Sequence, residues 1–536
     1  MLPIISRNNL SIIDMKKIQF LLLPFLLFCT ASFAQNKDAL GYAQVINSSN
    51  ARAHLTVLSA DAWRGREAGT EGGDKAAQYI SDYYHKVGLK GLVNGGYRQE
   101  VEARRIPLAE SLWVQGAAFK PVVDFFNMPA SVSMTGFQLK TDSILFAGYG
   151  VIDDGLESYN DFQDQAITGK VVMLLGSGPR DAAFSFQDKI KYLSFHKAKA
   201  VLMVEPVVDN KSDGLMQHLS NEQMLLQGSP ELAAVQAMAQ GMPLIYIGQK
   251  VADALLKSAH TDLAAVREKL TETNMPYPFV FKTDFAATAS RAVETVHTAN
   301  VLGFLEGSDP VLKNEVLLLS AHYDHLGVNH YTEGDSINNG ADDNGSGTTG
   351  VLLMADAFAQ AAKAGKGPKR SILFMATTGE EKGLLGSSWY VDHPVVPLDK
   401  IIANLNVDMI GRTDTLPHPD HNYIYIIGAD RLSTDLDRIV KETNTTYSKL
   451  ELDERYNVRN DPFQLYYRSD HYNFAKRGIP VTFYFSGFHA DYHKPSDEIE
   501  KIDFDILCKR AQLIFYTAWE LANAATKPVV DKKVEK

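Results

Sequence analysis

From about residue 297 onward, short apolar segments alternate with longer segments of helical periodicity. The apolar segments 316–320, 372–376 and 401–408 have the length of buried strands. Strands that alternate with helices pair in parallel, because a parallel neighbour needs a crossover connection. We therefore expect an α/β fold with a mainly parallel mixed sheet flanked by helices.

The chain of 536 residues is too long for one compact core. Residues 126–285 differ from the rest, with short apolar runs separated by Gly, Asp and Asn. We predict that they form a small β-rich insert in a main domain made of residues 35–125 and 286–525. The charged residues 526–536 are predicted to be a disordered tail.

Residues 1–34 have the order of a secretory signal. Lysines at 16 and 17 precede the apolar run 20–28, and small residues then lead to a cleavage site before Gln35. The chain could instead start at Met15. Cys29 raises a lipoprotein alternative, which the bulky residue before it disfavours, and the run is too short for a membrane anchor. We expect an exported protein, periplasmic or extracellular, without stable membrane insertion once the signal is removed.

The overall composition is that of an ordinary globular protein, with 45% hydrophobic and 22% charged residues. A formal net charge of -11 argues against non-specific binding to nucleic acid, which needs a basic surface. Cys508 is the one cysteine left after removal of the signal, so no intramolecular disulfide is expected. The oligomeric state stays open.

Metal-binding residue types follow several of the predicted strands. In open α/β sheets, ligands collect beyond the carboxyl ends of the strands, so these residues should meet at one edge. They are His322, Asp342–Asp343, Glu380–Glu381, Asp408 and His493.

Imidazoles and carboxylates together suit zinc or a similar divalent ion. Five such positions exceed the three protein ligands of a single catalytic zinc, so two metal ions that share one carboxylate fit better. A further carboxylate must then accept a proton from water and pass it to a leaving amine. The pair Glu380–Glu381 supplies both a ligand and a base.

Five segments in order resemble the signature of the co-catalytic di-zinc peptidase family, which includes bacterial leucyl aminopeptidases and glutamate carboxypeptidase. The segments are Ala321–Gly327, Gly340–Gly347, Gly379–Gly383, Asn406–Gly411 and Asp491–Asp497. The resemblance implies a zinc-dependent exopeptidase acting on peptide substrates. It assigns His322 and Asp408 to one zinc, Glu381 and His493 to the other, and Asp342 to both.

The same resemblance implies roles for other residues. Glu380 would be the general base, and Asp324 would bond the outer nitrogen of His322 to fix its tautomer. Tyr466 would donate to the oxyanion of the transition state. The peptide bond between Asp342 and Asp343 is expected to be cis. Within the insert, 146–151, 159–162 and 169–172 resemble a protease-associated domain.

Plainer interpretations exist for each motif. Glu380–Glu381 could begin a solvated helix, and Asp342–Asp343 could form an ordinary turn. His325 is interpreted as supporting the ligands or as structural, and Asp497 as structural. Four further histidines are predicted to be structural or exposed: His330, His393, His471 and His489.

Removal of N-terminal residues from peptides is the leading functional hypothesis. A second hypothesis is a carboxypeptidase for acidic dipeptides, which would need an arginine cluster for the extra carboxylates. The arginines available for such a cluster are Arg412, Arg455, Arg459 and Arg468. A third hypothesis is glutaminyl cyclisation with one zinc, and a fourth is a binding protein on an inactive peptidase scaffold.

Overall fold

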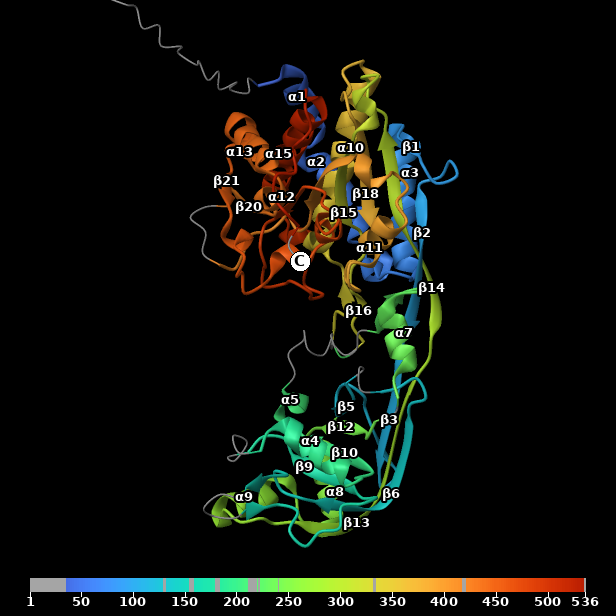
Figure 1. Cartoon of the computed structure of the whole chain (residues 1–536), viewed down its shortest axis with the longest axis vertical. Coiled ribbons are helices and arrows are strands. Elements are labelled where there is room, and N and C mark those ends of the chain that lie inside the picture. The colour runs from blue at the N-terminus through green and yellow to red at the C-terminus, as the bar shows by residue number, and fades with distance from the viewer. Residues whose placement is uncertain are drawn as a thin grey trace, which may run out of the picture.

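The computed structural model describes residues 35–128, 132–153, 159–178, 184–210, 219, 222–239, 241–330, 334–416 and 421–534. The predicted signal segment, with Cys29, lies outside these residues. The chain forms two lobes stacked along the long axis of the molecule (Figure 1). Each lobe is built on its own large sheet.

The larger lobe contains a ten-stranded mixed sheet. In spatial order its strands are β11 (Gln223–Leu226), β2 (Arg98–Ile106), β14 (Glu294–Leu305), β18 (Ser371–Thr377), β15 (Val316–His322), β19 (Ile401–Val407), β22 (Val481–Phe485), β20 (Tyr423–Ile427) and β21 (Glu451–Asp453), with β1 (Lys90–Gly91) beside β14. The four strands β18, β15, β19 and β22 are parallel, whereas β14 and β20 on either side run antiparallel to them. The α/β prediction is confirmed, and the parallel part is the centre of the sheet.

Helices cover both faces of this sheet. One buried cluster joins the sheet to α2 (Ser48–Leu58), α3 (Glu71–Val87), α10 (Gly347–Lys363) and α15 (Phe504–Asn523). A second cluster on the opposite face includes residues of α11 (Leu385–Asp392) and α14 (His471–Ala475). Every residue of β15, β18 and β19 is buried, as expected for central strands covered on both sides.

Further helices complete the larger lobe at its ends. They are α1 (Lys37–Tyr42), α12 (Ala429–Leu432) and α13 (Thr434–Thr443). Helix α3 ends as predicted at Gly88, whose φ of 94° is the left-handed conformation that glycine adopts readily. Its N-terminus is capped by the Thr70 side chain, which accepts the N–H of Gly73.

The smaller lobe contains an eight-stranded sheet and several helices. In spatial order the strands are β4 (Ala117–Phe119), β3 (Leu108–Val114), β13 (Phe279–Arg291), β6 (Phe137–Phe146), β9 (Val171–Leu175), β10 (Ala200–Val204), β12 (Leu244–Ile247) and β5 (Phe125–Phe126). The helices are α4 (Phe186–Phe195), α5 (Pro206–Asp209), α8 (Gln249–Leu256) and α9 (Leu263–Thr273), with α7 (Pro230–Ala237) near the junction (Figure 1). The likeness of this lobe to a protease-associated domain stays a prediction.

The strands of the smaller sheet extend from residue 108 to residue 291, beyond the predicted limits of 126 and 285. The reason is a long antiparallel ribbon that crosses from one lobe to the other (Figure 1). Strand β2 pairs with β14 in one sheet, and β3 pairs with β13 in the other. Only Pro107 separates β2 from β3, so the composition does not change where one lobe gives way to the next.

The predicted disordered tail is wrong for residues up to 534. Asp531 lies at the start of α13, where its carboxylate accepts the N–H of Thr434 at 3.1 Å. Its own N–H donates to the carbonyl of Leu432 at 3.1 Å. A carboxylate at a helix N-terminus satisfies an otherwise unpaired donor, and this contact holds the charged segment in place.

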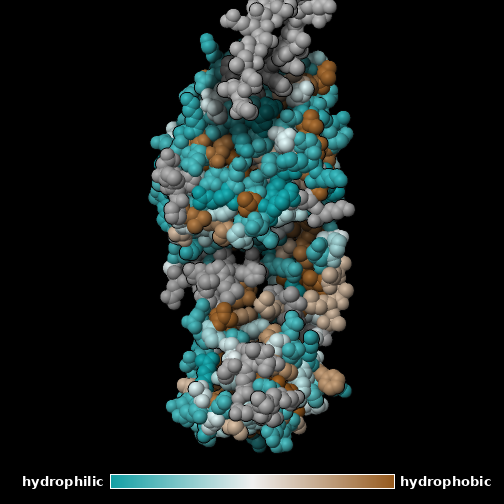
Figure 2. All heavy atoms as spheres, turned by 60° about the vertical axis from the view of Figure 1, so that its left-hand side comes forward, coloured by the Kyte–Doolittle hydropathy of each residue, from teal (hydrophilic) through white to brown (hydrophobic). Residues whose placement is uncertain are grey.

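The surface shown in Figure 2 is largely hydrophilic, with hydrophobic residues scattered among polar ones. Within the described part of the chain, no helix has both the length and the apolar character needed to cross a membrane.

The packing of α3 on β14 depends on Gly303. A Cβ atom at this position would lie 2.7 Å from ring and methyl carbons of Tyr84 and Leu89. We expect Gly303→Ala to lower the free energy of unfolding by about 1–3 kcal/mol, as overpacking does in a filled core. Chemical denaturation measures this change. Gly41→Ala is the control, because nothing lies within 4 Å of its Cβ position in α1. Equal stabilities of the two variants would contradict the packing argument.

Candidate metal centre

The predicted site residues meet at the carboxyl edge of the parallel strands. His322 is the last residue of β15, and Asp408 directly follows β19. Glu380 and Glu381 lie in the turn after β18, and His493 lies in the loop that follows β22. Rigid buried strands therefore fix the starting points of the segments that carry these side chains.

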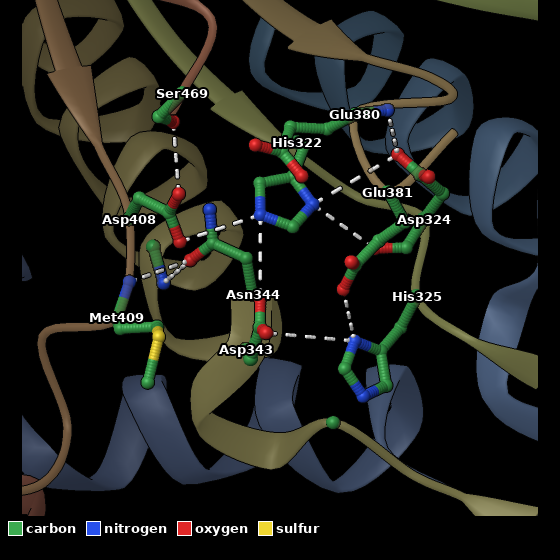
Figure 3. Close-up of polar contacts among 12 residues, drawn as sticks. His322, Asp324, His325, Asp343, Asn344, Glu380, Glu381, Asp408, Met409 and Ser469 are labelled. Carbon is green, nitrogen blue, oxygen red and sulfur yellow. Dashed lines mark hydrogen bonds and ion pairs between the residues drawn. The ribbon is translucent and has the colours of Figure 1, made fainter. Parts of the chain in front are cut away.

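The loop before α10 contributes Asp343, whose carboxylate lies between two imidazoles. The Nε2 atom of His322 is 3.4 Å from Oδ1 of Asp343 and 3.3 Å from Oδ1 of Asp408. The Nε2 atom of His493 is 3.2 Å from Oδ2 of Asp343 and 3.4 Å from Oε2 of Glu381. Figure 3 shows Asp343 pointing at His322 from below, with Asp408 to one side and Glu381 to the other.

These separations suit metal coordination better than direct hydrogen bonding. N–H···O bonds cluster near 2.9–3.0 Å, and the four contacts are longer. Two ligand atoms about 2.05 Å from a tetrahedral zinc are about 3.4 Å apart. The donors thus form two sets, one with His322 and Asp408 and one with His493 and Glu381, and Asp343 belongs to both. Imidazole and carboxylate are also the ligand types that zinc takes.

The prediction that Asp342 holds this central position is wrong. Its Oδ1 accepts the N–H of Gly411 at 2.6 Å, and its Oδ2 lies 3.4 Å from Nε2 of His489. The Asp342 carboxylate is fully buried on the opposite side of the loop from His322 and His493. The side chains of Asp342 and Asp343 point in different directions. An assignment that is wrong by one residue therefore names a carboxylate that does not contact His322 or His493.

The predicted cis peptide bond is also displaced by one residue, because the cis bond joins Asp343 to Asn344. The loop is held from behind by Asp497, whose carboxylate Oδ2 accepts the N–H groups of Asp342 at 3.0 Å and Asp343 at 3.1 Å. Asp497 thus has a structural role, as the sequence indicated, and it orients the backbone that carries Asp343.

Asp324 supports the site through different atoms from those expected. Nδ1 of His322 is 3.1 Å from the backbone carbonyl of Asp324 and 3.8 Å from its carboxylate. The hydrogen bond that orients the imidazole is therefore made by the carbonyl. The Asp324 carboxylate instead accepts the N–H of Glu380 at 3.2 Å and so positions the turn after β18.

Glu380 lies beside the first donor set. One of its carboxylate oxygens is within 4.8 Å of ligand atoms of both His322 and Asp408. Burial raises the pKa of the Glu380 carboxyl well above its usual range, and the neighbouring carboxylates of Glu381 and Asp408 raise it further. A carboxylate with a raised pKa in this position is suited to accept a proton.

Two hydrogen bonds orient Asp408 and the loop next to it. Ser469 donates from its hydroxyl to Oδ2 of Asp408 at 2.8 Å, which leaves Oδ1 to face His322. The side chain of Asn344 donates to the carbonyl of Val407 at 2.9 Å and accepts the N–H of Met409 (Figure 3). Sequence reasoning did not assign a role to Ser469 or Asn344, although Asn344 lies within a segment that the resemblance covers.

Arg66 ties the amino-terminal segment to the site. Its fully buried guanidinium donates to the carbonyls of Tyr323 at 2.9 Å and Gly340 at 2.9 Å, and also to those of Leu58 and Asn339. The bonds therefore join the end of β15 to the loop that carries Asp343. Sequence reasoning missed this function, because the segment around Arg66 was interpreted as a turn.

A small cavity opens beside the donors. The tyrosine that lines this cavity is Tyr492, whereas the sequence predicted Tyr466. Tyr466 is not among the lining residues, because its ring packs against Gly428 and under the guanidinium of Arg431, 4.7 Å away. Tyr492 immediately precedes His493, and the two rings stack 3.7 Å apart. Its position beside a predicted ligand histidine was the signal that could have identified it.

His325, His471 and His489 have supporting or structural positions, whereas His330 and His393 are exposed. Nδ1 of His325 lies 2.8 Å from Oε1 of Glu381, so His325 contacts the second donor set as expected. His471 is buried and stacks on Phe483. His489 lies against Asp342 behind the loop.

Comparison with known proteins gives one family match and a set of partial relatives. Residues 300–518 match the sequence profile of peptidase family M28. Leupeptin-inactivating enzyme 1 of Streptomyces exfoliatus is 30% identical over 251 residues, which cover 43% of this chain and 50% of that protein. Aminopeptidase YwaD of Bacillus subtilis (strain 168) is 27% identical over 241 residues, covering 44% and 47%. The chain thus aligns with about half the length of these relatives.

Solved structures resemble most of the chain in fold. The aminopeptidase from Aneurinibacillus sp. strain AM-1 has a TM-score of 0.53 with 17% identity, covering 92% of this chain and 98% of that one. BSAP, a zinc aminopeptidase from Bacillus subtilis, also has a TM-score of 0.53, with 21% identity and coverage of 91% and 99%. At this level of identity, the likeness shows a shared fold and nothing further.

The two neighbouring aspartates provide a direct test of the site geometry. We expect Asp343→Asn to reduce the zinc retained after dialysis and to lower turnover by more than about 100-fold, since supporting residues alone change metal affinity by 10–100-fold. Asp342→Asn keeps the shape of a side chain that faces Gly411, so it should retain zinc. Metal analysis of both purified variants is the measurement. Loss of zinc from Asp342→Asn with retention in Asp343→Asn would contradict the assignment.

Proposed function

We propose that the protein is a two-zinc aminopeptidase of peptidase family M28, whose profile matches residues 300–518. It would remove N-terminal residues from peptides after export, as the predicted signal implies. The observation that carries the proposal is the pair of donor sets that share Asp343. Each set supplies one imidazole and two carboxylates, the number of protein ligands that leaves a position open at a catalytic zinc.

The chemistry of the proposed reaction is divided between the ions and the chain. Bound zinc ions supply Lewis-acid catalysis and lower the pKa of water. Glu380 takes the proton of the attacking water and returns it to the departing amine. The hydroxyl of Tyr492 donates a hydrogen bond to the oxygen on which negative charge develops. Burial raises the pKa of the Tyr492 phenol well above its ordinary value, and nearby carboxylates add to this effect, so the donor stays protonated.

The apolar part of the cavity supports a preference for large apolar N-terminal side chains. The lining residues of this kind are Met409, Leu465, Phe483, Phe485 and Phe488. Burial of an apolar substrate side chain against these residues would stabilise the complex by about 25 cal/mol for each Å² of apolar area removed from water. A probable leucine aminopeptidase of Arthroderma benhamiae, 29% identical over 220 residues, agrees with this preference.

The hypothesis of a carboxypeptidase for acidic dipeptides has less support, because the arginines are dispersed. Arg412 pairs with Asp491 at 3.0 Å, and Arg455 pairs with Asp453 at 2.6 Å. Arg468 is the arginine that lines the cavity. One guanidinium does not form the cluster that several extra carboxylates would require.

The role of Glu380 can be tested by an isosteric change. We expect Glu380→Gln to retain zinc and the thermal stability of the wild type, because the amide keeps the shape of the side chain. It should lose about 100- to 10,000-fold in kcat, the range for removal of a general base. Steady-state kinetics with zinc analysis of the same sample measure both quantities. Near-normal turnover by a zinc-loaded variant would contradict the assignment.

The direction of cleavage can be tested with peptides and their N-acetylated copies. We expect stepwise release of N-terminal residues from free peptides, fastest for leucine and phenylalanine, and no release from the blocked copies. Chelation should abolish the activity, and added zinc should restore it. Mass spectrometry of the products is the measurement. Equal cleavage of blocked peptides, or release from the C-terminus, would favour the carboxypeptidase hypothesis.

A further inference from the structure

Arg468 lies at the exposed side of the cavity that contains the donors. Its guanidinium is 5.3 Å from the centre of the Phe488 ring, and its Nη2 is 3.3 Å from the phenolic oxygen of Tyr492. Tyr492 in turn stacks on His493. A cation is therefore held against the wall of the cavity, next to a residue that contacts the second donor set.

The charge of Arg468 has no carboxylate partner in the part of the chain that the structure describes. Among the residues that the structure describes, no Asp or Glu oxygen lies within 4.0 Å of its guanidinium nitrogens. Arg412 and Arg455 differ in this respect, since each has a carboxylate within 3.0 Å. The Tyr492 contact uses one nitrogen, so most of the five N–H donors of Arg468 are left for another group.

The carboxylates of the site do not require Arg468 for neutralisation. The cavity is lined by Asp343, Glu380, Glu381 and Asp408, and two divalent cations would balance these four charges. Arg468 is then a surplus positive charge at the exposed side of the cavity. A planar guanidinium with free donors recognises a carboxylate by paired hydrogen bonds.

We propose that Arg468 binds a carboxylate of the peptide substrate close to the scissile bond, and so selects anionic substrates. This inference rests on the proposed aminopeptidase function. The carboxylate has three sources: the C-terminus of a dipeptide, an acidic side chain after the scissile bond, or an acidic N-terminal side chain. All three present the same group to the same guanidinium, and isosteric substrate pairs distinguish them.

A purely supporting role for Arg468 predicts a different outcome. If Arg468 only holds Phe488 and Tyr492 in place, its removal slows charged and neutral substrates equally. If Arg468 binds a carboxylate, its removal slows cleavage of the charged substrate in a pair more than that of the neutral one. The ratio of their kcat/KM values then falls toward one. The ratio of kcat/KM values within each pair is therefore the informative quantity.

The experiment compares the zinc-loaded wild type with Arg468→Gln and Arg468→Lys on three pairs. They are Leu-Gly with Leu-Gly-amide, Leu-Asp-amide with Leu-Asn-amide, and Glu-Gly-amide with Gln-Gly-amide. In at least one pair, we expect the wild type to favour the carboxylate, and Arg468→Gln to reduce that preference about tenfold. Arg468→Lys keeps the charge but lacks the fork, so it should restore part of the preference.

Arg438→Gln is the control, because Arg438 pairs with Asp435 and Glu442 on the surface of α13. It should leave every ratio unchanged. If the enzyme cleaves these substrates and Arg468→Gln changes no ratio, the inference about Arg468 is overturned and the aminopeptidase proposal stands. If the zinc-loaded wild type cleaves none of the pairs, the aminopeptidase proposal fails, and the inference fails with it.

Discussion

The site is organised around the Asp343 carboxylate, which lies between the imidazoles of His322 and His493. Its two oxygens face different imidazoles, so a displacement of this side chain would disrupt both donor sets at once. The surrounding carboxylates repel one another and are buried, which costs free energy unless cations or hydrogen bonds compensate. The rest of the larger lobe must therefore hold these groups together against their repulsion.

The fold meets this requirement with rigid supports on every side of the loop. The strands β15 and β19 are buried along their whole length, so the groups at their ends have little freedom to move apart. Asp497 fixes the loop backbone by accepting two N–H groups, and Arg66 fixes it by donating to carbonyls. The Arg66 charge also lies in the field of the acidic site, where it opposes the repulsion between carboxylates.

The sequence predicted the general arrangement well, because hydrophobic periodicity identifies buried strands and parallel strands place their ends at one edge. It assigned the shared position to Asp342 instead of Asp343, since both are aspartates in the same loop and backbone direction alone separates them. The tyrosine of the cavity was also misassigned, because the packing of Tyr466 under Arg431 was not visible in the residue pattern. Long-range contacts such as that of Asp531 with α13 also leave no local signal.

Two arginines show how environment separates structural from functional charge. Arg66 is fully buried and four of its five N–H donors bind backbone carbonyls, so it serves the backbone and not a ligand. Arg468 is exposed, contacts an aromatic ring and one phenol, and keeps donors unused beside the cavity. A residue that only supported the wall of the cavity would not need a charge, since an apolar side chain packs on Phe488 without any cost of desolvation. The inferred carboxylate of the substrate would give the guanidinium a use that packing on Phe488 alone does not.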